Sequence, residues 1–148
     1  MRPSLVITRL RDQCPLLGDR VSGAIGRDDA LDIAMGEGRG LPVPCAFVVW
    51  SGEAVGNEQI LDGLSDTVET TFAITAIVSG VADGIGQDAS ERLLDVRDEL
   101  LAALVGWAPT GGRYGACIYE GCPDAPLYNR AYGAATFVFS AQYFTNAP

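Results

Sequence analysis

The pattern of hydrophobic and polar positions predicts one well-defined helix in the second half of the chain, over residues 88–105. Its apolar residues recur at the spacing of one helical face, at Leu93, Val96, Leu100 and Leu104. Asp88 stands at the start with Glu91 three residues later, the arrangement of a capping box. Gly106 and Pro109 follow the last apolar position, and both residue types end helices.

Alternating apolar and polar residues predict strands on both sides of this helix. Cys45–Trp50 has the composition of a buried strand. Asp66–Ser79 alternates over a length that is unusual for one strand, and Ala134–Phe144 alternates aromatic and small residues near the end. The shorter strand candidates are Val21–Ile25, Gly115–Glu120 and Pro126–Arg130.

The remaining segments complete the prediction of an α+β fold in one domain over residues 1–148. We expect a first helix over Ser4–Leu17 and a helical turn or short helix over Asp28–Met35. Two further segments are expected to be long loops, Gly36–Pro44 and Ser51–Leu64. We expect a mostly antiparallel mixed sheet packed by two main helices as a single layer pair. The expected core residues are Phe47, Val49, Phe72, Leu100, Leu104, Trp107, Phe137 and Phe139.

The chain is acidic, with a formal net charge of −9, and its ten cations are all arginine. This charge argues against a nucleic-acid-binding surface and disfavours binding to anionic membranes. Arginine recurs early, and we expect these residues on a solvated helix face, the alternative being a subunit contact: Arg9, Arg11, Arg20 and Arg27. No apolar run approaches the ~20 residues of a membrane helix and no signal peptide is expected, so we expect synthesis and retention in a cytoplasm.

The sequence nominates no catalytic residue, cofactor or metal site. Without histidine or lysine it has no Ser-His or Cys-His pair, no Schiff-base amine and no phosphate-loop lysine. Its cysteines form no Cys-x-x-Cys pair, which argues against zinc. Cys45 lies in an apolar run, and Cys117 and Cys122 flank a short segment across which they could meet. In a reducing cytoplasm we expect free thiols.

The order of elements and a few short motifs resemble a known family. A strand with Pro44-x-Ala46-Phe47-Val48 precedes a polar loop and a long strand with Phe-Ala-Ile-Thr. The amphipathic helix then ends at Gly106-Trp107-x-Pro109, and Phe137-Val138-Phe139 lies in the last strand. From about Leu5 to Phe144 the chain resembles the tail terminator, or tail completion, proteins of tailed bacteriophages, the group related to Mu-like minor tail proteins. It departs from the pattern at Cys117–Pro126.

The resemblance implies a structural protein of the virion, assembled in the host bacterial cytoplasm. Members of this family are small α+β subunits that form a hexameric ring on the head-proximal end of the tail tube. The ring stops tube polymerisation and joins the tail to the head connector or neck protein. Viral DNA passes through its lumen without specific binding, which suits an acidic chain because like charges repel.

A closed ring needs two different complementary faces on each subunit. We expect the long strand and the preceding loop to supply contacts with neighbouring subunits or the tube, through Glu53, Asn57, Glu58, Gln59, Glu69 and Thr71. Trp107 is expected to be a core residue at the end of the main helix. The alternatives are another phage neck, head-tail joining or tube protein, and a generic binding module with no phage role.

Overall fold

The computed structural model describes residues 1–36, 40–55, 67–80 and 87–144. Three helices and six strands follow one another in the order α1 (Pro3–Gln13), β1 (Val21–Ser22), α2 (Ala24–Met35), β2 (Cys45–Val55), β3 (Thr67–Ser79), α3 (Gln87–Leu104), β4 (Ile118–Gly121), β5 (Leu127–Tyr128) and β6 (Tyr132–Phe144). The strands form one sheet in the order β1-β2-β3-β6-β4, with β5 pairing one end of β6. Only β1 and β2 are parallel, which makes the sheet mixed but mostly antiparallel.

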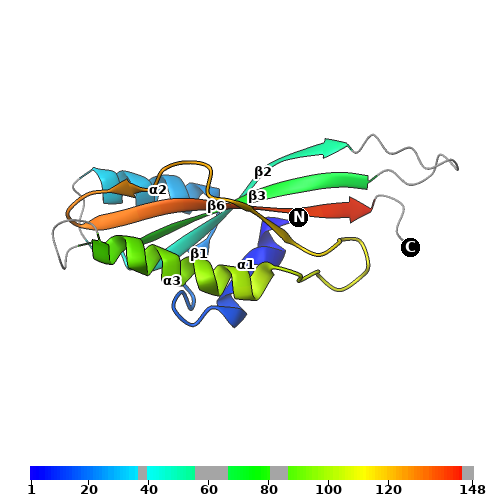
Figure 1. Cartoon of the computed structure of the whole chain (residues 1–148), viewed down its shortest axis with the longest axis horizontal. Coiled ribbons are helices and arrows are strands. Elements are labelled where there is room, and N and C mark those ends of the chain that lie inside the picture. The colour runs from blue at the N-terminus through cyan, green and yellow to red at the C-terminus, as the bar shows by residue number, and fades with distance from the viewer. Residues whose placement is uncertain (37–39, 56–66, 81–86, 145–148) are drawn as a thin grey trace, which may run out of the picture.

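Helices cover parts of both faces of this sheet. Figure 1 shows α1 and α3 on one side and α2 on the other. The larger apolar cluster joins α1 and α3 to one sheet face through Val6, Leu93, Phe72 and Phe137, among others. A smaller cluster joins Ala30 and Ala34 of α2 to the opposite face. The predicted α+β class is confirmed, but in place of the expected single layer pair the sheet has helices on both faces, because α2 packs opposite α1 and α3.

Several predicted boundaries were wrong, among them those of the first helix, the main helix and β2. The first helix ends at Gln13 rather than Leu17, since the residue before Pro15 avoids the helical conformation. The main helix begins at Gln87, which places Asp88 inside its first turn rather than at the cap. β2 continues through Ser51–Val55, a segment predicted as loop, while positions 56–64 of that predicted loop lie outside the described residues.

The two central strands carry the core. Phe72 of β3 and Phe139 of β6 are fully buried and stack with ring centroids 5.6 Å apart. Tyr119 of β4 lies 5.2 Å from Phe139 on the same face, so the stack crosses three neighbouring strands. The buried members of the expected core set are Phe47, Phe72, Leu100, Leu104, Phe137 and Phe139.

Two members of the expected core set lie at its margin. Val49 is half-buried because it faces the α2 side of the sheet, beyond the strand residues that α2 covers. Trp107 follows the end of α3 and packs half-buried against the larger cluster. The guanidinium of Arg9 sits 5.4 Å from the centre of the Trp107 ring, and Arg9 Nε donates to the Ala103 carbonyl at 3.0 Å. These contacts fasten α1 to the C-terminal end of α3.

The other early arginines also bond within the fold rather than only facing solvent. Arg11 donates to the carbonyl of Val21 at 2.7 Å, and Arg20 to that of Pro44 at 2.8 Å. Arg27 pairs with the carboxylate of Asp28 at 3.0 Å. Arg11 and Arg20 therefore brace the connections around β1, which gives them a structural role that the sequence pattern did not reveal.

We predict that Leu100→Ala lowers the free energy of unfolding by about 2–5 kcal/mol, because it leaves a cavity in the core. Leu94→Ala on the same helix is the matched control, since Leu94 is 44% exposed. It should cost less than about 1 kcal/mol. Urea unfolding followed by circular dichroism measures both variants, and equal losses would contradict the placement of α3.

Candidate interaction surface

The sheet runs past its helices at one end. Figure 1 shows β2, β3 and β6 extending together beyond α1 and α3, on the side where β2 and β6 finish. Trp50 and Val55 of β2 are 51% and 67% exposed in this region. Exposed large apolar side chains on a sheet that no described helix covers are a feature of interaction surfaces. We refer to residues 50–55, 67–71 and 140–144 as the sheet end.

The sheet end presents the predicted contact residues on two different faces. Glu53 is opposite Thr70 in the β2–β3 register, and both line a hollow on the α1 side. Glu69 and Thr71 flank Thr70 along β3, so their side chains point to the other face. Glu53 and Glu69 are exposed and Thr71 is half-buried. The fold therefore brings Glu69 and Thr71 together and separates them from Glu53.

The hollow on the α1 side holds about 370 Å³ and has an aromatic wall. The rings of Tyr114 and Tyr143 lie 5.2 Å apart there, and Trp50 lines the same hollow. Arg113 donates to the hydroxyl of Tyr143 at 3.2 Å. Aromatic and arginine side chains around an open hollow are a composition favoured at protein interfaces.

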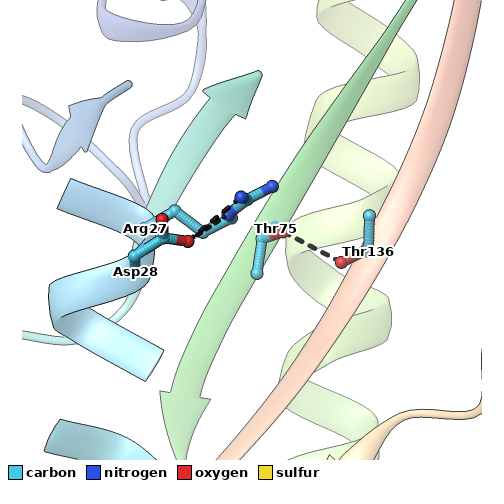
Figure 2. A network of polar contacts seen from close by, with 4 residues as sticks. All are labelled: Arg27, Asp28, Thr75 and Thr136. Atoms are coloured by element: carbon cyan, nitrogen blue, oxygen red, sulfur yellow. Dashed lines mark hydrogen bonds and ion pairs between the residues drawn. The ribbon is translucent and has the colours of Figure 1, made fainter. Parts of the chain in front are cut away.

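Polar side chains on the α2 side are bonded within the fold. The hydroxyls of Thr75 and Thr136 share a hydrogen bond of 2.9 Å between β3 and β6, and Figure 2 shows the Arg27 side chain pointing from α2 toward Thr75. Ser140 donates to a carboxylate oxygen of Glu120 at 2.6 Å. These bonds fix the relative position of neighbouring strands and leave Glu69 and Thr71 as outward-facing polar groups of this face.

The described part of the chain contains no obvious catalytic or metal-binding arrangement. Within it, no three His, Cys, Asp or Glu side chains lie close enough to share a metal ion. Every buried side-chain nitrogen or oxygen in these residues has a hydrogen-bond partner. No helix formed by them is long and apolar enough to cross a membrane. The open surface at the sheet end is thus the feature that stands out for function.

Sequence reasoning found part of this surface. Glu53, Glu69 and Thr71 lie in it, whereas Asn57, Glu58 and Gln59 are outside the described residues. It missed Trp50, which the composition of the strand suggested was buried. Gly52 was the available signal in the sequence, because a glycine inside a strand often marks a β-bulge. In the structure its φ is 127° and the β2–β3 register shifts beside it, as in a bulge inside a longer strand.

Comparison with known proteins agrees with this architecture. The family model described as "Phage tail terminator protein" matches residues 1–147. The chain belongs to the phage tail terminator family. This makes it a structural protein of the phage virion, located in the tail. The link to the Mu-like group rests on the sequence resemblance alone. No curated protein matches the terminator chain.

A solved structure has the same fold. It is a chain of the "Virion of native gene transfer agent (GTA) particle", with a TM-score of 0.51 and 17% sequence identity. The match covers 94% of the terminator chain and 91% of the other chain. At this identity the likeness concerns the fold, and it extends over nearly the whole domain.

The four cysteines of the terminator chain are free thiols in two different environments. Cys14, Cys45 and Cys117 are buried and Cys122 is exposed. Burial raises the pKa of each buried thiol from its ordinary value of 9.0 to about 11. These three thiols therefore stay protonated and shielded in the folded chain, as expected of core residues.

We predict that a disulfide reagent at pH 8 modifies Cys122 alone in the native protein, and all four cysteines after unfolding in guanidinium. Absorbance of the released thiol and intact mass measure the number modified. Cys122→Ser is the control and should abolish the native reaction. Rapid modification of Cys14, Cys45 or Cys117 in the folded protein would contradict their burial.

Proposed function

We propose that the chain ends the tail tube by forming a closed ring on its head-proximal end. The ring would be a homohexamer that stops tube polymerisation and offers its other side to the head connector or neck protein. Membership of the phage tail terminator family is the observation that carries this proposal. The open sheet end adds a surface suited to protein contacts.

The two faces of the sheet end suggest that each face contacts a different partner. A subunit in such a ring must contact its neighbours and the tube at the same time. Glu69 and Thr71 face away from the aromatic hollow, and we assign them to the tube contact. We assign the hollow with Trp50, Tyr114 and Tyr143, on the opposite face, to the contact with a neighbouring subunit.

The acidic character of the chain fits a ring through which DNA moves. A net charge of −9 repels phosphate and disfavours retention of the genome as it passes. The role needs no catalysis and no cofactor, and we propose that the chain has neither.

We predict that the purified chain caps growing tubes of its cognate tail tube protein. Tubes polymerised with increasing amounts of the chain should become shorter, with one extra ring at a single end. Electron microscopy of negatively stained tubes gives their length. Glu69→Arg should weaken capping by about tenfold, because it places an unmatched charge in a contact surface.

Asp95→Arg is the matched control, since it makes the same charge change on the exposed side of α3. It should cap as well as the unchanged chain. Tubes of unchanged length in the presence of excess folded chain would contradict the terminator role. Incorporation of the chain all along the tube would instead identify it as a tube subunit.

A further inference from the structure

The first turn of α2 carries an apolar side chain that projects from the surface. Ile25 is 81% exposed, more than any other large apolar residue in the described part of the chain. Gly26 seats this turn closely on β2, since a Cβ at Gly26 would lie 3.2 Å from the ring of Phe47. Ile25 is thus held outward by a turn that is fixed to the sheet. A single exposed apolar residue is common on protein surfaces, so its surroundings decide what it means.

Carboxylates flank Ile25 on the outer surface of α2. Asp28 and Asp29 follow it by three and four residues, so both lie next to it on the helix surface. Asp28 pairs with Arg27 at 3.0 Å, whereas Asp29 has no ion pair within the described residues. We refer to Ile25 and Asp29 as the α2 knob. It presents an apolar group and a negative charge side by side.

The aromatic hollow at the sheet end has the matching properties. Its wall of Trp50, Tyr114 and Tyr143 is largely apolar, and its volume of about 370 Å³ leaves room for an aliphatic side chain. Arg2 and Pro3, where α1 begins, line the same hollow. The hollow therefore offers an apolar surface beside the start of a helix.

The α1 side of this hollow favours a negative charge. No side chain caps the N-terminus of α1, and its first turn contains no acidic residue. The N-terminal amides of a helix and the guanidinium of Arg2 both attract a carboxylate. Arg2 forms no ion pair with the described part of the chain. Glu53 lines the hollow from β2, so a carboxylate is favoured next to α1 rather than next to β2.

The knob and the hollow lie on opposite faces of the sheet. Figure 1 shows α1 on one side and α2 on the other, and the two apolar clusters agree with this placement. Ile25 therefore cannot reach the hollow of its own chain. A contact between the knob of one copy and the hollow of the next uses two different surfaces. Contacts of this kind close into a ring when the rotation between copies fits.

We propose that the α2 knob, Ile25 and Asp29, inserts into the aromatic hollow of a second copy of this chain. Ile25 packs against the aromatic wall, and Asp29 pairs with Arg2 at the start of α1. The inference rests on the proposed ring, and it names the two surfaces that join neighbouring subunits.

The first test removes the apolar part of the knob. Ile25→Ser should raise the concentration of chain that caps half of the tube ends by about tenfold, because the hollow stays unfilled. Leu94→Ser is the matched control, since Leu94 is also a helical residue, is 44% exposed and lies outside both surfaces. It should cap as the unchanged chain does. Electron microscopy gives the capped fraction, and circular dichroism checks the folding of each variant.

The second test exchanges the charges across the contact. Asp29→Arg and Arg2→Asp should each weaken capping by about tenfold, and the double variant should restore it. Aspartate is a favoured residue at a helix N-cap, so Arg2→Asp should not weaken α1. A double variant that caps no better than the single variants would overturn the inference.

Crosslinking gives a third test, because it reports which surfaces meet. Ile25→Cys and Pro3→Cys are combined in a Cys122→Ser background, and the chain is added to tubes at saturating concentration. Mild oxidation should then join neighbours into a ladder of covalent oligomers on a denaturing gel, while either new cysteine alone should give none. The absence of a ladder, or dimers from Ile25→Cys alone, would overturn the inference.

The outcomes separate this inference from the proposed function. If the unchanged chain neither caps tubes nor forms a ring, both fail. If it caps tubes and Ile25→Ser and Asp29→Arg cap equally well, the knob contact is wrong and the ring stands. If only Arg2→Asp weakens capping, the hollow holds the tube or neck protein instead, which also overturns the inference.

Discussion

The pairing of β3 with β6 is the constraint on which the rest of the structure depends. The two strands are matched in register along their full lengths, from Thr67 opposite Phe144 to Ser79 opposite Tyr132. A slip of one residue would turn every side chain to the other face and break up the Phe72–Phe139 stack. β2 and β4 attach to the outer sides of this pair, and helices pack against both of its faces.

The length of this pair has a consequence for assembly. The central strands are longer than the stretch of sheet that the helices cover, so a stable core leaves an open sheet end beyond it. The rigid strands that position the core also position Trp50, Glu53 and Glu69. Interaction groups carried on strands are held more precisely than groups on loops, which suits a subunit that must fit several neighbours at once.

Much of the fold could be predicted because local patterns and packing agree. The helical spacing of Leu93, Val96, Leu100 and Leu104 gave α3, and strict alternation gave β3 and its two faces. The second half of β2, Ser51–Val55, was missed because its polar residues and Gly52 suggest a loop. Pairing with a neighbouring strand can outweigh the preference of such a composition for a loop. The sheet end was not predictable as a surface, since it depends on which strands lie side by side.

The most direct test of the terminator role is a cryo-electron microscopy map of intact virions. The account predicts one ring of this chain between the last tube ring and the head connector. Copies of the chain stacked along the tube, or no density for it at the junction of tail and head, would contradict the account.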